Sequence, residues 1–115
     1  MKNKSKIRER YMKDSLPIRL GGLAANLARV SSIVKNPANA QAVNGLLEES
    51  KHFIEWTAIE AELETTAELV ELQIKLSLWQ LNLDKTWHDE EQRLDIAQQA
   101  KHWSDEVLKY SGLLG

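Results

Sequence analysis

Glutamate and histidine residues lie at short spacing in this chain, and side chains of these two types can bind metal ions. Glu49 and His52 have the Glu-x-x-His spacing with which helices hold carboxylate-bridged di-iron sites. Such a site needs a second copy of the pattern, but Gln99 takes the place of the glutamate before His102, and His88 precedes its glutamate. On a helical wheel at about 100° per residue, His52 also points away from the apolar face of its own helix. We therefore expect no metal site and no cofactor.

No local motif for catalysis or nucleotide binding accompanies these histidines. None of them shares a motif with a serine nucleophile, and the chain has no cysteine. A phosphate-binding loop of the Gly-x-x-x-x-Gly-Lys-Ser/Thr type is absent from the sequence, and Gly21-Gly22 lies inside a helical pattern. We therefore expect a protein that is not an enzyme.

Charge is unevenly distributed, although the net charge is only -2. Residues 1–14 carry six basic side chains against two acidic ones, whereas residues 48–71 carry eight acidic side chains against one lysine. Both segments are compatible with solvated surfaces, or they attract each other within or between chains. A basic arm can also neutralise phosphates, so a nucleic-acid-associated regulator is our second hypothesis. Its contact residues would be Lys4, Lys6, Arg8, Arg10 and Lys13. The acidic body and the lack of a basic recognition helix make nucleic acid the less favoured partner.

The apolar residues do not favour a membrane protein. No apolar run approaches the roughly 18–20 residues of a transmembrane helix. The N-terminal stretch has no apolar segment behind its charges, so we do not expect a signal peptide. Lack of cysteine fits a reducing compartment, and we expect a cytoplasmic protein.

Prolines and capping residues predict helices along the chain. Pro17 and Pro37 suit the first turn of a helix, with Ser15 and Asn36 as caps. This predicts one helix over about 16–35 and a second from about 38. A short helical segment is expected before Asp14.

The second half of the chain has no proline, and its glycines lie only near its end. Capping residues must therefore indicate where its helices begin and end. Two capping boxes, beginning at Thr57 and Thr65, are candidate starts of a third helix that runs to about Leu83. A turn at 84–86, with Thr86 as cap, then predicts a fourth helix over about 87–111 that ends before Gly112. Residues 1–115 are thus expected to form a single all-α domain, an up-down antiparallel four-helix bundle. A helical hairpin completed by a second chain is the variant.

The third predicted helix is apolar on two opposite sides. One row of this helix contains Leu63, Ala67, Val70, Ile74, Leu78 and Leu81, and the other contains Leu69, Leu72, Leu76, Trp79 and Leu83. A helix that is apolar on two sides must be covered on two sides. We therefore expect a homo-oligomer, most simply a two-fold dimer, and assign self-association to the row that begins at Leu69. The alternative is that this helix is central in a monomer.

Two further features suggest contact surfaces. Gly21, Ala25 and Ala28 lie together on the face opposite the leucine row of the first helix, where another helix could approach closely. Trp56 lies off the core stripe of the second helix, and such tryptophans are often contact residues. We add these four residues to the predicted self-association surface.

The stretches "LPIRLGGLAANLARVSS", "FIEWTA" and "WSDEVLKYSGLL" resemble small uncharacterised all-helical proteins found in cyanobacteria. The resemblance covers much of the chain and implies a helical fold, but no activity and no residue roles. The leading hypothesis is therefore a non-enzymatic helical bundle that self-associates and presents helical faces to a protein partner.

Overall fold

The computed structural model describes the backbone of residues 4–113 and the side chains of residues 5–113. This part of the chain forms five α-helices and one short 3-10 helix, with no strand. The helices are α1 (Lys4–Met12), α2 (Leu16–Ile33), α3 (Ala40–Thr57), α4 (Leu63–Thr86) and α5 (Glu90–Ser111), and the 3-10 helix η1 spans Pro37–Asn39.

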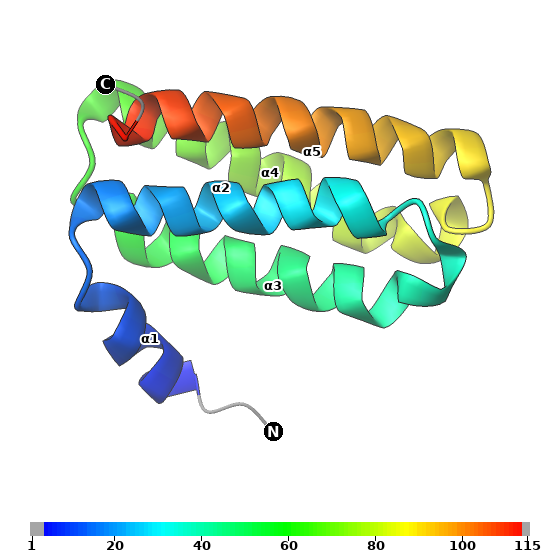
Figure 1. Cartoon of the computed structure of the whole chain (residues 1–115), viewed down its shortest axis with the longest axis horizontal. Coiled ribbons are helices and arrows are strands. Elements are labelled where there is room, and N and C mark those ends of the chain that lie inside the picture. Colours follow the sequence, from blue (N-terminus) through cyan, green and yellow to red (C-terminus); the bar gives the residue numbers. More distant parts are fainter. Residues whose placement is uncertain (1–3, 114–115) are drawn as a thin grey trace.

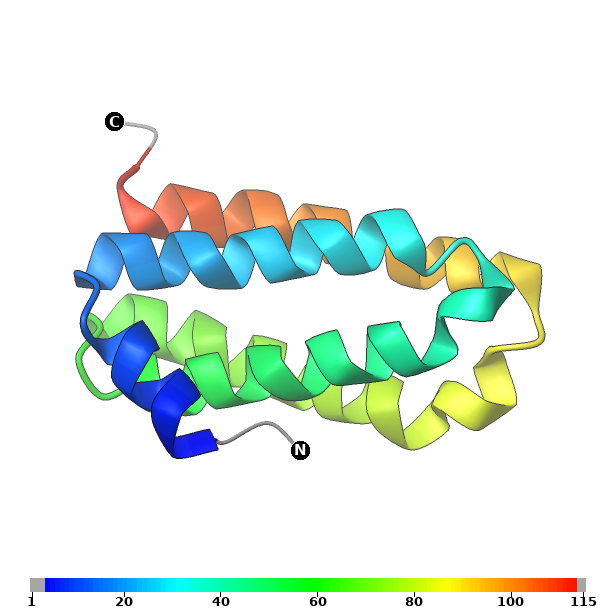
Figure 2. The same cartoon turned by 60° about the horizontal axis from the view of Figure 1, so that its bottom comes forward.

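The four long helices form an up-down antiparallel bundle, as predicted, and α1 is the extra N-terminal helix (Figure 1). Each long helix packs beside its neighbour in the chain, and α5 returns to lie along α2. Figure 2 shows α1 resting outside the bundle, against α3. Among the described helices, none has both the length and the apolar character needed to cross a bilayer.

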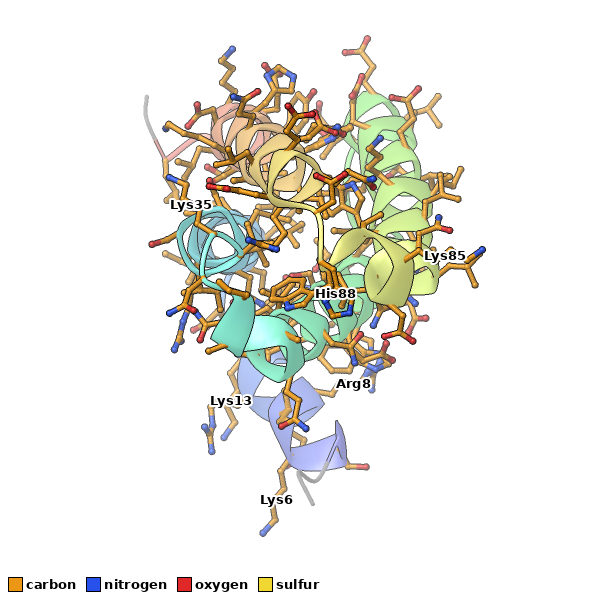
Figure 3. The ribbon with its side chains drawn as sticks, turned by 90° about the vertical axis from the view of Figure 1, so that its right-hand side faces the viewer. Lys6, Arg8, Lys13, Lys35, Lys85 and His88 are labelled. Atoms are coloured by element: carbon orange, nitrogen blue, oxygen red, sulfur yellow. The ribbon has the colours of Figure 1, made fainter. Side chains whose placement is uncertain are left out.

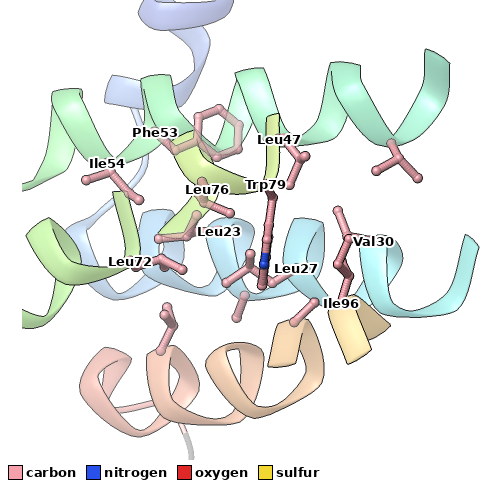
Figure 4. Close-up of a cluster of buried hydrophobic side chains, with 14 of the residues drawn as sticks. Leu23, Leu27, Val30, Leu47, Phe53, Ile54, Leu72, Leu76, Trp79 and Ile96 are labelled. Atoms are coloured by element: carbon pink, nitrogen blue, oxygen red, sulfur yellow. The ribbon is translucent and has the colours of Figure 1, made fainter. Parts of the chain in front are cut away.

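One apolar core runs along the inside of the bundle. All four long helices contribute to it, and Figure 4 shows its central part. Fully buried members include Leu23, Leu27, Val30, Val43, Leu47, Leu72, Leu76 and Val107. Because burial of one large aliphatic side chain stabilises a fold by about 1.5–3 kcal/mol, this cluster is the main source of stability.

Small side chains allow α2 and α5 to approach closely. Ser104 Oγ donates to the carbonyl oxygen of Ala24 at 2.7 Å, and Ser31 Oγ donates to that of Ala97 at 2.6 Å. The serine side chain is short, so these bonds require the two backbones to lie close together. Helices α2 and α5 make the most extensive contact among the described helices.

The break between α4 and α5 lies later than predicted. The expected turn at 84–86 is wrong, because α4 continues to Thr86 and the chain turns at 87–89. Leu83 and Trp87 are both buried, and Trp87 Nε1 donates to the carbonyl oxygen of Pro37 at 2.8 Å. Asp89 rather than Thr86 caps α5, with its Oδ1 accepting from the Glu91 N–H at 3.0 Å.

The two predicted capping boxes do not start a helix. Thr57 is the last residue of α3, and α4 begins at Leu63. Thr66 Oγ1 donates back to the carbonyl oxygen of Ala58 at 2.7 Å, which closes the connection between the two helices. The cap at Asn36 is confirmed, since its Oδ1 accepts from the Ala38 N–H at 2.9 Å.

Tyr11 attaches α1 to the bundle. Its ring stacks on Phe53 of α3, with centroids 4.0 Å apart and planes 7° apart. Its hydroxyl donates to the carbonyl oxygen of Arg19 at 2.9 Å and lies 3.0 Å from Thr57 Oγ1. The buried Arg19 side chain pairs with Glu60, so one cluster joins α1, α2 and the end of α3.

The surroundings of Tyr11 keep its phenol protonated. Burial raises the pKa of Tyr11 to about 12, with the Thr57 hydroxyl and Arg19 opposing the shift. Because the folded pKa lies above the unfolded value of 10.0, the neutral phenol stabilises the fold fully below pH 10. That contribution disappears as the pH rises from 10 to 12.

Tyr11→Phe should lower the free energy of unfolding by about 1–3 kcal/mol, because it leaves buried polar groups on Thr57 and Arg19 without their partner. It should also flatten the loss of stability between pH 10 and 12. Urea denaturation followed by circular dichroism measures both effects.

Tyr110→Phe is the matched control, since the Tyr110 hydroxyl lies near the surface and donates to Glu106 Oε2 at 3.4 Å. We expect it to change stability by less than Tyr11→Phe. The comparison is made at pH 7, because the pKa of Tyr110 is also raised to about 12 and both variants should alter the loss of stability above pH 10. Equal losses of unfolding free energy at pH 7 would contradict the anchoring role of Tyr11.

Candidate functional site

The row of α4 predicted for self-association lies inside the bundle. The five residues are all buried: Leu69, Leu72, Leu76, Trp79 and Leu83. They pack in the core cluster shared by the four long helices. Their assignment to a surface between copies is therefore corrected: they are core residues of one chain.

The opposite row of α4 is the one that remains at the surface. We call it the outer row, and its residues are Leu63, Ala67, Val70, Ile74, Leu78 and Leu81. Its five large side chains are between 48% and 86% exposed. From Leu63 to Leu81 the row is about 27 Å long, at 1.5 Å per residue. Exposed apolar patches of this extent are typical of contact surfaces.

The position of α4 in the bundle explains why only one of its rows is covered. Its neighbours α3 and α5 meet it from the side of the core, and α1 lies on the other side of α3 (Figure 2). No described element covers the outer row. The chain therefore covers one of the two apolar faces of α4, and it is the face that the sequence analysis assigned to self-association.

Charges flank the outer row unevenly along α4. Glu64, Glu68 and Glu71 lie in its N-terminal half, whereas Lys75, Asp84 and Lys85 lie in its C-terminal half. The Lys75 ammonium also sits 6.0 Å from the centre of the Trp79 ring.

Glu68 is half-buried and faces α5. Partial burial, together with Glu68 and Glu106, raises the pKa of Tyr110 on α5 to about 12. Glu68 therefore belongs to the contact between α4 and α5 as well as to the acidic half of α4.

The predicted small-residue face of α2 has a helix beside it but remains partly open. Gly21 is half-buried, and a Cβ added there would lie 2.7 Å from Leu113 Cδ1, so the glycine leaves room for that leucine. Ala25 and Ala28 are exposed. Helix α5 approaches on the flank of this face that carries Ala24, rather than over its centre.

Trp56 lies in a groove between α1, α2 and α3. The groove has a volume of about 550 Å³, and its lining includes Ile7, Arg29, Leu46 and Trp56. The Trp56 ring is 5.6 Å from the His52 ring, with planes 14° apart. Trp56 is half-buried rather than fully exposed, and its contacts lie within the chain.

Glu49 and His52, the pair with di-iron spacing, turn to different partners. Glu49 Oε1 accepts from Asn26 Nδ2 at 3.1 Å. His52 lies between two other carboxylates, with Nε2 3.3 Å from Glu48 and Nδ1 3.4 Å from Glu55. Within residues 5–113, no three potential ligands of these types are grouped as a metal ion would require.

The basic residues predicted to contact nucleic acid lie on and just after α1. Lys6, Arg8, Arg10 and Lys13 are exposed, while the Lys4 side chain and residues 1–3 lie outside the described part. Figure 3 shows Lys6, Arg8 and Lys13 pointing in different directions around the helix. A nucleic-acid surface needs its cations on one face or along one groove, so this arrangement does not favour it. Nucleic-acid binding stays a prediction.

A charged side chain should have different effects on folding in the two rows of α4. Leu76→Asp places a carboxylate in the closed core, and we expect it to cost more than about 4 kcal/mol and to abolish folding. Ile74→Asp, two residues away on the outer row, should leave helix content and cooperative unfolding intact. Circular dichroism with thermal melting compares them, and a well-folded Leu76→Asp protein would contradict the assignment of the rows.

The chain was also compared with known proteins. No family model, no curated protein and no solved structure matches it.

Proposed function

We propose that this protein is a non-enzymatic, self-associating helical bundle whose outer row on α4 binds a second copy of the chain. The observation that carries the proposal is the exposure of this row along most of the length of α4. The row lies on a rigid helix whose opposite side is anchored in the core by Leu69, Leu72 and Leu76. Such a surface can dock without rearrangement of the bundle.

The energy available from the outer row is suited to reversible association. Complete burial of a large aliphatic side chain contributes about 1.5–3 kcal/mol. Covering the five half-exposed side chains on each of two copies therefore contributes on the order of 10 kcal/mol. Loss of translational and rotational freedom costs about 4–15 kcal/mol. Because these quantities are of similar size, we expect a dimer whose population depends on concentration.

A second copy fits this surface better than an unrelated protein of uniform charge. The outer row is apolar along its centre, and α4 carries charges of both signs, with Glu64, Glu68 and Glu71 in its N-terminal half and Lys75, Asp84 and Lys85 in its C-terminal half. The apolar centre of one copy can therefore cover that of another. Association through a two-fold axis is also the commonest symmetry of soluble homo-oligomers.

Native mass measured by light scattering over a range of concentrations tests the proposal. The monomer mass is 13.1 kDa, and the apparent mass should rise towards twice this value as concentration increases. Ile74→Asp places a charge in the centre of the outer row. We expect it to hold the protein at the monomer mass without loss of helix content.

Ile18→Asp is the matched control, because Ile18 is also a half-exposed isoleucine but lies on α2. It should leave association unchanged. A wild-type protein that is monomeric at every concentration would overturn the proposal. So would an Ile74→Asp protein that associates as strongly as the wild type.

A further inference from the structure

The groove that contains Trp56 has the size and the lining of a site for a small molecule. Its volume of about 550 Å³ lies within the roughly 300–1,000 Å³ that is usual for ligand pockets. Half-buried apolar side chains line it from three helices: Ile7 from α1, Ile33 from α2, and Leu46 and Trp56 from α3. Ligand sites in helical proteins commonly lie between helices in this way. We call this hollow the Trp56 groove.

Gly45 lies in the lining of the Trp56 groove, although no contact within the chain requires a glycine there. It is in the interior of α3, where glycine destabilises a helix relative to alanine. A Cβ added to Gly45 would have no heavy atom within 4 Å beyond its own helix backbone. Ala42, which also lines the groove, adds only a methyl group. The lining therefore leaves open space over α3 that a bound molecule can fill.

Arg29 supplies the charge that the Trp56 groove offers to a ligand. The two carboxylates of the lining are bonded within the chain, since Glu49 accepts from Asn26 Nδ2 at 3.1 Å. Glu48 likewise accepts from Gln80 Nε2 at 3.1 Å. Among the residues that the structure describes, none pairs with the guanidinium group of Arg29. A guanidinium group beside apolar surface suits a carboxylate, because it can donate two parallel hydrogen bonds to it.

From the shape and the charge of the lining together, we propose that the Trp56 groove binds a small aromatic carboxylate. The carboxylate accepts from Arg29, and the aromatic body lies over Gly45 and against Trp56. The Trp56 ring already lies nearly parallel to that of His52, and aromatic rings of this kind favour further offset stacking. The groove is formed by α1, α2 and α3, so the proposal is independent of association through α4.

Titration with anilinonaphthalene sulfonate tests the proposal, because this aromatic anion becomes fluorescent in apolar surroundings. Its sulfonate stands in for the carboxylate, and phenylnaphthylamine is the uncharged analogue. The wild-type protein should bind one sulfonate dye per chain. Arg29→Gln should weaken binding of the sulfonate dye about tenfold, which is the loss expected for one charge-assisted contact, and should leave the uncharged dye unaffected. Lys101→Gln is the matched control, since it removes the same charge from the exposed face of α5, away from the groove.

Gly45→Leu fills the groove and should weaken the binding of both dyes about tenfold or more. Circular dichroism should show an intact bundle, because the space beside Gly45 is open and leucine favours a helix. Failure of the wild-type protein to bind the sulfonate dye would refute the proposal. Binding that Gly45→Leu leaves unchanged would place the dye elsewhere, and an Arg29→Gln protein that binds both dyes like the wild type would show no selection for an anion. Either result also refutes it.

Discussion

A helix in a four-helix bundle has room for only one of its faces against the core, and α4 carries apolar side chains on two. The fold resolves this by burying the row with Leu69, Leu72 and Leu76 and by leaving the row with Val70 and Ile74 in water. Burying both rows within one chain would require another element on the outer side of α4. The extra helix α1 packs on α3 instead, so it does not supply that cover.

The position of α1 follows from a few polar side chains at one end of the bundle. Arg19 is buried, and its guanidinium group reaches Glu60 and the carbonyl oxygen of Asp14. Tyr11 docks where its hydroxyl can donate to the Arg19 carbonyl oxygen and also form a hydrogen bond with the Thr57 hydroxyl. Because these groups lie at the start of α2 and the end of α3, α1 is held beside α3.

The sequence predicted the number, direction and approximate extent of the long helices, because prolines, caps and apolar periodicity are local signals. The cap at Asn36 was predicted in this way. The local signals failed where a distant residue decided the outcome. Thr57 begins a capping-box pattern, but its hydroxyl is bonded to Tyr11, 46 residues away. The polar residues at 84–86 suggested a turn, whereas the buried Leu83 and Trp87 keep the chain close to the core there.

The two rows of α4 have the same periodicity, so periodicity could not decide which one faces inward. One available signal was side-chain volume. The buried row consists of leucines and Trp79, whereas the exposed row includes the smaller Ala67 and Val70. Larger side chains fill a core better, and this comparison selects the correct row.

The attachment of α1 also has a consequence for the order in which the chain acquires its structure during synthesis. Residues 4–12 are translated before Phe53 and Thr57, which are partners of Tyr11 in the folded structure. A helix of nine residues is marginal by itself in water, so α1 has no docked state until α3 has emerged and folded beside α2. Helix α1 therefore reaches its final position only after segments that are translated later than it.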